Sequence, residues 1–364
     1  MKNISAILLA GGRGTRLQSL THNKSKSYVS FLGKFRIIDF PLSSLSYSGI
    51  KSVGIITQYE PYRLMKYIGN GSSWDLDSFE EGISFLTPFE SVNNEITIQK
   101  GTANAVLSQI EFIKHSKDEY FLILYGDQIY KIDFRNVLNE HIKNNACLTV
   151  LSTTIDNIEE AKRFGVIEKD ENDRIINFEE KPDNPKTNNI SLGIYLFNKE
   201  TLLKYLPLAN ELVDFGKDLI PYILKRENNV FTYTHKGLFV DVGTIESLYD
   251  ANMYFLDNPK VMDNKGLDFK IYSKPSIDAP IYISKEGKVI NSILSDGVSI
   301  KGTIKHSLIS LNVSVGDKSY IEDSIVMPDA KIGNNVRLKN AIVDEMKEIE
   351  DNTVLEFDKP TVVN

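Results

Sequence analysis

Hydrophobic positions follow two different periods along the chain. Up to about residue 256, short runs rich in Ile, Val and Leu alternate with segments of helical spacing. The runs predict buried strands at Ile4–Leu9, Val53–Thr57, Tyr120–Leu124, Leu148–Thr153 and Ile194–Phe197. Helical spacing is found in Ala103–Lys114, where Thr102 is placed to cap the start, in Asp218–Arg226 and in Ile245–Leu256. The alternation predicts an α/β fold, a Rossmann-like and mostly parallel sheet with helices on both faces, which gathers ligands at the carboxyl ends of its strands.

Beyond residue 280 the helical spacing gives way to a repeat. Aliphatic residues recur every five or six positions at Val298, Ile304, Ile309, Val315, Ile321, Val326, Ile332, Leu338, Val343 and Ile349. The spacing repeats every 17 residues, and similar five-residue segments begin at His306, Asp323 and Asn340. This repeat predicts a triangular parallel β-helix, wound to the left or to the right, and favours it over an antiparallel β domain with irregular strands.

The polar stretch Asp257–Pro280 has the composition of a connector. We therefore expect a catalytic domain over 1–256, a linker over 257–280 and a β-helix domain over 281–364. A coil of this kind buries little apolar surface alone and exposes stackable ends. We expect it to pack on the first domain and to help build an oligomer.

Composition narrows the class of protein. The 364 residues carry a formal net charge of −7, which argues against a nucleic-acid binder that works through overall positive charge. Cys147 is the only cysteine, so an intrachain disulfide is excluded and a reducing, cytoplasmic location is expected. The apolar run Ile4 to Ala10 is too short to span a bilayer, and no membrane association is expected.

A glycine-rich loop follows the first predicted strand. Gly11, Gly12 and Gly14 let the backbone approach a ligand and turn its N–H groups toward an anion. The loop is neither a dinucleotide fingerprint nor a P-loop, since Leu17 stands where the third glycine would be and no Gly-Lys-Ser/Thr follows. Four cations lie nearby: Arg13, Arg16, Lys24 and Lys26. A polyphosphate cradle is favoured over a plain tight turn beside a solvated charge run.

Two aspartates are candidates for a magnesium site. Asp127 ends the strand that begins at Tyr120, and Asp241 lies between apolar residues just before a helix. Carboxylates so placed can hold Mg²⁺ against a phosphate. Each also has a structural alternative, since Asp127 could cap a turn and Asp241 could interact with the helix dipole.

Motifs along nearly the whole chain resemble the sugar nucleotidyltransferase superfamily, and specifically the bacterial glucose-1-phosphate adenylyltransferases. The glycine loop identifies only the superfamily, whereas two longer phrases are more particular to the adenylyl branch: Lys34-Phe35-Arg36-Ile37-Ile38-Asp39-Phe40 and Asp214-Phe215-Gly216-Lys217-Asp218. Further matches are Thr57-Gln58-Tyr59, Gly101-Thr102-Ala103, Gly126-Asp127-Gln128-Ile129-Tyr130-Lys131, Phe164-Gly165-Val166, Glu180-Lys181-Pro182, Ser191-Leu192-Gly193-Ile194-Tyr195 and Asp241-Val242-Gly243-Thr244. The family also carries a C-terminal β-helix, which implies left-handed winding here.

The resemblance implies roles for the matched positions. It implies nucleotide binding by Leu9, Gly11, Gly12, Gly14, Thr15, Gln58, Gly101 and Thr102. It implies that Arg16 and Lys26 contact the phosphates of ATP as catalytic residues, and that Asp127 is catalytic and holds Mg²⁺ together with Asp241. It implies binding of glucose 1-phosphate by Gly165, Glu180, Lys181, Ser191 and Asp241. Such a set would align two anionic substrates and offset the charge that develops during transfer.

The implied reaction is ATP + glucose 1-phosphate giving ADP-glucose and pyrophosphate, for glycogen or another α-glucan. The chain departs from the family pattern at Ser27 and Tyr28 after Lys26, at Ile98-Gln99, at Gln128 and at Phe239. The alternatives are a regulatory subunit and a superfamily enzyme that uses another nucleotide. The family implies a homotetramer, or a hetero-oligomer with a paralogous subunit.

Overall fold

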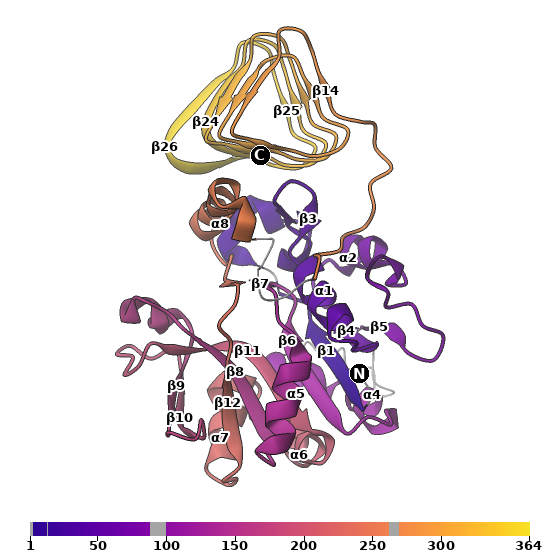
Figure 1. Cartoon of the computed structure of the whole chain (residues 1–364), viewed down its shortest axis with the longest axis vertical. Coiled ribbons are helices and arrows are strands. Elements are labelled where there is room, and N and C mark those ends of the chain that lie inside the picture. Colours follow the sequence, from indigo (N-terminus) through magenta and orange to yellow (C-terminus); the bar gives the residue numbers. More distant parts are fainter. Residues whose placement is uncertain (1–2, 13, 88–99, 262–268) are drawn as a thin grey trace.

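The computed structural model describes residues 3–12, 14–87, 100–261 and 269–364 (Figure 1). Arg13 and the Ile98-Gln99 pair of the sequence analysis lie outside these ranges. An α/β part, built from the first two-thirds of the chain, lies below a triangular coil built from the last third, with α8 (Ile245–Asp257) between them.

The α/β part is built on a mixed nine-stranded sheet. Its main path runs in the order β10-β9-β11-β6-β1-β4-β5, with β8 pairing β11 and β12. The parallel half contains β1 (Ile4–Leu9), β4 (Ser52–Ile56), β5 (Gly82–Leu86) and β6 (Tyr120–Tyr125). The other half contains β8 (Leu148–Thr154), β9 (Gly165–Lys169), β10 (Ile175–Glu180), β11 (Asn189–Asn198) and β12 (Val230–Thr234). Because β11 runs antiparallel to β6, β8 and β9, the sheet is parallel over only part of its width.

Alternation along the strands produces two hydrophobic cores, one on each face of the sheet. In β1, Ile7 and Leu9 belong to one core, whereas Ala6 and Leu8 belong to the other. The first core is covered by α3 (Thr102–Leu107), α4 (Ile110–His115), α6 (Lys199–Tyr205) and α7 (Ile220–Leu224). The second is covered by α1 (Asp39–Tyr47), α2 (Pro61–Ile68) and α5 (Phe134–Lys143). Helices on both faces, as predicted, are therefore confirmed.

Two of the predicted helices differ in detail. The helix expected over Ala103–Lys114 is broken into α3 and α4, because the Gln109 backbone leaves the helical conformation. The side-chain amide of Gln109 donates to the Thr87 carbonyl at 3.4 Å. The helix expected over Asp218–Arg226 begins as a π-helical turn, Phe215–Leu219, which continues into α7. Pro221 at the start of α7 has no N–H to extend a regular ladder backward.

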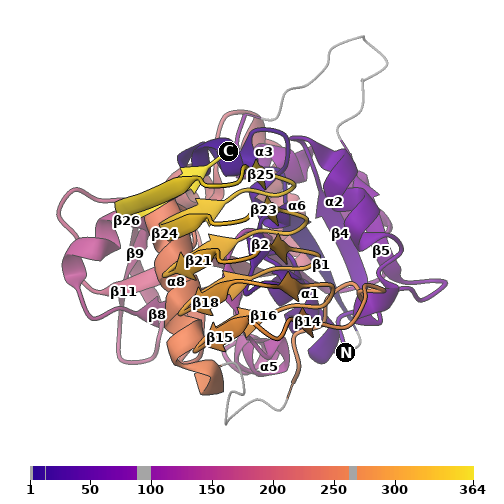
Figure 2. The ribbon, with the colours of Figure 1, turned by 90° about the horizontal axis from the view of Figure 1, so that it is seen from above.

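The C-terminal third forms the predicted triangular parallel β-helix (Figures 1 and 2). One face is formed by β14 (Tyr282–Ile283), β17 (Ser299–Ile300), β20 (Ser314–Val315), β23 (Lys331–Ile332) and β25 (Glu348–Ile349). A second is formed by β15 (Lys288–Ile290), β18 (Thr303–Lys305), β21 (Tyr320–Glu322), β24 (Arg337–Val343) and β26 (Val354–Val363). The third begins with β16 (Ile293–Leu294), β19 (Leu308–Ile309) and β22 (Ile325–Val326), and β24 and β26 continue it.

The 17-residue period holds for most coils but fails at the corner after Ile300 and in the last coil, where Ile342 is stacked with Val362, 20 positions later. Val315 is stacked under Ile332, 17 positions later, whereas the residue stacked on its other side is Ile300 rather than the expected Val298. Val298 is instead buried next to β17, because the corner between Ile300 and Ile304 is two residues shorter than the equivalent later corner. The repeated segments begin at residues of positive φ: His306, Asp323 and Asn340.

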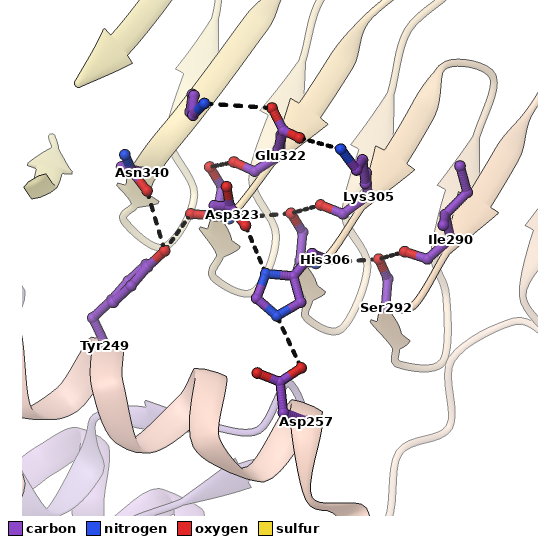
Figure 3. A network of polar contacts seen from close by, with 12 residues as sticks. Tyr249, Asp257, Ile290, Ser292, Lys305, His306, Glu322, Asp323 and Asn340 are labelled. Atoms are coloured by element: carbon purple, nitrogen blue, oxygen red, sulfur yellow. Dashed lines mark hydrogen bonds and ion pairs between the residues drawn. The ribbon is translucent and has the colours of Figure 1, made fainter. Parts of the chain in front are cut away.

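The coil packs on the α/β part, as expected from its limited core. Leu308, Ile325 and Ile342 of the coil share a hydrophobic cluster with residues of α8 and of segment 17–40. Polar contacts reinforce this interface (Figure 3): the Tyr249 hydroxyl donates to the Asp323 carbonyl at 2.7 Å. His306 lies between Asp257, at 3.1 Å, and Asp323, at 2.6 Å. The interface therefore has both apolar and charged components.

Among the helices of the described residues, none combines the length and the apolar character needed to cross a membrane.

Candidate active site

A two-part cavity opens at the carboxyl ends of β1, β4 and β6. The smaller part, about 290 Å³, is lined by Leu9, Gly11, Gly12, Ile56, Gln58, Lys100, Gly101, Thr102, Ala105, Tyr125 and Asp127. The larger part, about 720 Å³, shares Lys100, Gly101, Thr102, Tyr125 and Asp127 with it. Parallel strands end at one edge of a sheet, which explains why residues so distant in sequence meet here. Asp127 therefore lies at the junction of the two parts.

The larger part is lined by most of the remaining predicted site residues: Arg16, Lys26, Gly165, Glu180, Lys181, Ser191 and Asp241. Gly14 and Thr15 line neither part. Gly14 has a role in shaping the loop instead, because its φ of +62° is left-handed and an added Cβ would lie 3.0 Å from the Lys26 Cβ. The Thr21 hydroxyl donates to the Gly14 carbonyl at 2.9 Å and fixes this turn.

The Lys26 ammonium connects the two predicted metal ligands. Its Nζ lies 3.2 Å from Asp127 Oδ2 and 3.3 Å from Asp241 Oδ1. Asp241 also accepts from Arg163 Nη2 at 3.0 Å. The two acids come together because β7 (Ile129–Tyr130), just after Asp127, pairs with β13 (Phe239–Val240), just before Asp241. The pairing of these short strands builds the charged centre of the cavity.

Asp241 does not cap the following helix. Thr244 is the N-cap of α8, and its hydroxyl and the Ser247 side chain form a reciprocal capping box. The Asp241 carboxylate is instead paired with Lys26 and Arg163. An added Cβ at Gly243 would lie 3.1 Å from both Arg16 Nη2 and Asp241 Oδ2, so the Arg16 guanidinium lies over this segment.

The donor set is chemically suited to a divalent cation that substrate phosphates help to bind. Mg²⁺ is commonly held by one or two carboxylates together with phosphates and water. Asp127 and Asp241 meet this requirement, since both already face one positive charge. The described residues contain no cluster of three or more His, Cys, Asp or Glu that could form a protein-only metal site. Any ion held here would complete its ligand set with water or with substrate phosphates.

Only some of the four cations near the glycine loop line the cavity. Arg16 and Lys26 line it, and Arg13 lies outside the described residues. Lys24 was expected in the same phosphate cradle, but it is buried against Asp344 and Glu345 of the β-helix, at 3.3 and 3.1 Å. The physical reason is that two partly buried acids of the coil pair with its ammonium at the interface.

The wall opposite the glycine loop places Glu180 between two glycines. An added Cβ would lie 2.9 Å from Glu180 Oε2 at Gly165 and 2.6 Å from it at Gly216, so both positions allow a close approach. Burial raises the pKa of Glu180, although Lys181 opposes the shift. Lys181 Nζ lies 3.1 Å from Glu180 Oε1, and the Lys181 backbone has a φ of +49°, a strained geometry often found at functional sites.

Thr102 does not cap α3; Gly101 is the N-cap. The Thr102 hydroxyl instead donates to Asp214 Oδ2 at 2.9 Å and accepts from the Phe215 N–H at 3.1 Å. Asp214 also accepts from the Lys217 N–H at 3.0 Å, so it caps the π-helical turn. This turn is of a rare type that is frequent at functional sites. The hydrogen bonds of Thr102 therefore join the Gly101-Thr102 segment to the Asp214–Asp218 motif at the cavity wall.

Several lining residues were not among the predicted site residues: Lys100, Tyr125, Gln128, Arg163, Tyr195 and Lys217. The Gln128 side-chain oxygen is buried without a hydrogen-bond partner, which suits a group that meets a ligand. The Gly126–Lys131 and Asp214–Asp218 phrases already contained Gln128 and Lys217. Nothing in the local pattern distinguishes Arg163 from a surface cation, because its role depends on Asp241, 78 positions later.

Comparisons with known proteins match this architecture. The nucleotidyl transferase family model matches residues 5–258, and a model described as GlmU-like, C-terminal hexapeptide, matches residues 281–361. Proteins named glucose-1-phosphate adenylyltransferase from Bacillus cereus and Bacillus anthracis are each 40% identical over 358 residues, covering 97% of this chain and 95% of theirs. The chain belongs to the glucose-1-phosphate adenylyltransferase family.

Membership in this family extends across both parts of the molecule. The protein of that name from Bacillus cytotoxicus is 40% identical over 364 residues, which cover 99% of this chain and 96% of the relative. The hexapeptide match agrees with the left-handed parallel β-helix expected from the resemblance. The glucose-1-phosphate adenylyltransferase family assignment therefore does not depend on the glycine loop alone.

Proposed function

We propose that this chain transfers AMP from ATP to glucose 1-phosphate, giving ADP-glucose and pyrophosphate for glycogen or another α-glucan. The observation that carries the proposal is the contact of Lys26 with both Asp127 and Asp241 where the two parts of the cavity meet. The names of the relatives support the choice of substrates.

The smaller part of the cavity suits adenosine. Leu9, Ile56 and Ala105 supply apolar walls for a base, and Gln58 supplies hydrogen-bonding groups. Space is open at Gly12, where an added Cβ would meet no atom within 4 Å, so the backbone can approach a phosphate. We assign ATP to this side, with its phosphates directed toward Asp127.

The larger part of the cavity suits glucose 1-phosphate. Lys181 offers an exposed cation for its phosphate, and the Glu180 carboxylate and the Ser191 hydroxyl offer partners for sugar hydroxyls. The sugar phosphate then lies opposite the ATP phosphates across Lys26 and Asp127. Such an alignment of reacting groups can supply most of the rate enhancement when no covalent enzyme intermediate is formed.

In the proposed reaction, a phosphate oxygen of glucose 1-phosphate attacks the α-phosphorus of ATP, and the bond to pyrophosphate breaks. Arg16 and Lys26 hold phosphate oxygens and offset the negative charge that develops on them. Asp127 and Asp241 would hold Mg²⁺, which supplies further positive charge to the phosphates when bound. We place the enzyme in the cytoplasm, as a homotetramer or as a hetero-oligomer with a paralogous subunit.

Pyrophosphate release by the purified chain tests the proposal. We expect release with ATP and glucose 1-phosphate in the presence of Mg²⁺, and none when EDTA removes the metal. A preference for UTP or dTTP would refute adenylyl transfer. No release with any nucleotide, together with stimulation of a catalytic paralogue, would identify a regulatory subunit instead.

A further inference from the structure

One turn of the β-helix inserts a carboxylate among cations of the α/β part. Glu345 lies between β24 and β25, and only 7% of its side chain is exposed. It contacts Lys24 Nζ at 3.1 Å, Arg63 Nη1 at 3.9 Å and Arg36 Nη1. Burial alone would raise the pKa of Glu345, but Arg36 and Lys24 lower it below its usual value, so the carboxylate is charged. The coil therefore supplies the anion that these cations share.

These contacts hold both ends of the turn that carries Lys26. Lys24 precedes the short 3₁₀ turn Lys26–Tyr28. Arg36 acts on the other end, because its Nη1 donates to the Tyr28 carbonyl at 2.9 Å and its guanidinium lies 4.0 Å from the centre of the Tyr28 ring. Glu345 thus contacts Lys24, which precedes the turn, and Arg36, which binds the end of the turn.

Backbone hydrogen bonds also hold the Lys26 turn, since the Tyr28 N–H donates to the Ser25 carbonyl and the Ile38 N–H to the Ser27 carbonyl, both at 3.0 Å, but its bond to the glycine loop is weaker. The Lys26 N–H donates to the Gly12 carbonyl at 3.4 Å, a long bond, and no proline restricts residues 27 and 28. Its Nζ must nevertheless remain within reach of Asp127 and Asp241. A displacement of about 1 Å at a reacting group can lower a rate by about a hundredfold. A fixed anchor for this turn is therefore valuable.

We propose that Glu345 is a positioning residue, through which the β-helix holds Lys26 at the junction of the cavity. The contact is not needed to attach the coil, because the interface also contains Leu308, Ile325 and Ile342 and the separate contacts of His306 and Tyr249. A role in catalysis rests on the proposed function, whereas a role in the position of Lys26 does not.

The test compares Glu345→Gln with Lys24→Met. Lys24→Met leaves Glu345 its contact with Arg36 and serves if the first variant fails to fold. For each variant we expect kcat/KM for pyrophosphate release to fall about tenfold or more, within the loss that misplacement can cause. Because Glu345→Gln already removes the charge with which Lys24 pairs, the double variant should be no slower than the slower single variant. The control is Glu356→Gln, which removes an exposed partner of Arg337 on the coil and should leave kcat/KM unchanged.

A second readout is independent of catalysis. Lys26 is buried and ion-paired, so an amine-acetylating reagent should label it slowly, and Glu345→Gln should raise that labelling rate at least fivefold by mass spectrometry. A folded Glu345→Gln that keeps wild-type labelling or wild-type kcat/KM refutes the proposal, as do losses that multiply in the double variant. A wild type that releases no pyrophosphate refutes the proposed function, while labelling still decides the position of Lys26.

Discussion

The substitution Asp127→Asn separates a metal-binding role from a structural one. It removes a charge without changing the shape of the side chain. Asp127 is 31% exposed and its contact with Lys26 is an ion pair of 3.2 Å, partly screened by water. Lys26 also keeps its contact with Asp241 at 3.3 Å. We therefore expect a loss of no more than about 1 kcal/mol in the free energy of unfolding, which lowers Tm by about 2–4 °C at most.

The expected effect on catalysis is much larger. Loss of one electrostatic partner of the developing charge commonly costs a hundredfold or more in kcat, about 2.7 kcal/mol in the activation free energy. We therefore expect at least a hundredfold fall in the kcat of pyrophosphate release at saturating ATP, glucose 1-phosphate and Mg²⁺. Thermal unfolding of the same preparation would show whether the fold is intact.

A matched control is Asp173→Asn. Asp173 is 55% exposed, pairs with Lys169 at 2.6 Å and lines neither part of the cavity, so its loss should leave kcat unchanged. A metal-binding role for Asp127 is refuted if Asp127→Asn keeps more than a tenth of wild-type kcat. It is also refuted if the variant loses activity only because it unfolds.

Three further outcomes are expected. Lys26→Met removes the cation between Asp127 and Asp241, so calorimetry without nucleotide should show Mg²⁺ binding about tenfold tighter, as expected for a partly screened unit charge; equal or weaker binding contradicts this. Lys181→Ala should raise KM for glucose 1-phosphate about tenfold and leave KM for ATP within about twofold; an unchanged KM removes Lys181 from the site. Burial lowers the pKa of His306, but Asp323 and Asp257 outweigh it and raise the pKa overall. Its stabilisation is therefore present below the ordinary pKa of about 6.5 and is lost as pH rises through the raised value. Urea unfolding should show His306→Asn destabilised by up to about 1 kcal/mol more at pH 6 than at pH 9; a difference independent of pH contradicts this.

Local patterns carried much of the fold. The short apolar run at Ile4–Leu9 predicted a buried strand, and the chain forms it over these residues with its two sides in different cores. The hexapeptide spacing identified the coil, because each short strand of a parallel β-helix supplies one inward aliphatic residue at a regular interval. The exception at Val298 arose because one corner of the coil is two residues shorter than the later ones. Counting aliphatic positions cannot detect this difference, because the neighbouring Ile300 is also apolar and takes the stacked position.

The site was accessible from sequence only in part. Motifs named Asp127, Asp241 and Lys26, because special residue types at strand ends are local signals. They could not show that one ammonium lies between both acids, since this depends on the pairing of β7 with β13. Nor could they separate Lys24 from Lys26, two positions apart, which face different partners.

Local sequence patterns thus predicted most strands and helices, the repeat and the types of chemical group at the site. Which charges meet depends on the folded structure: Arg163 pairs with Asp241, 78 positions later, and Lys24 of the α/β part pairs with Glu345 of the coil. The physical reason is that hydrophobic period acts over a few neighbouring residues, whereas an ion pair depends on the distance between atoms after the chain has folded.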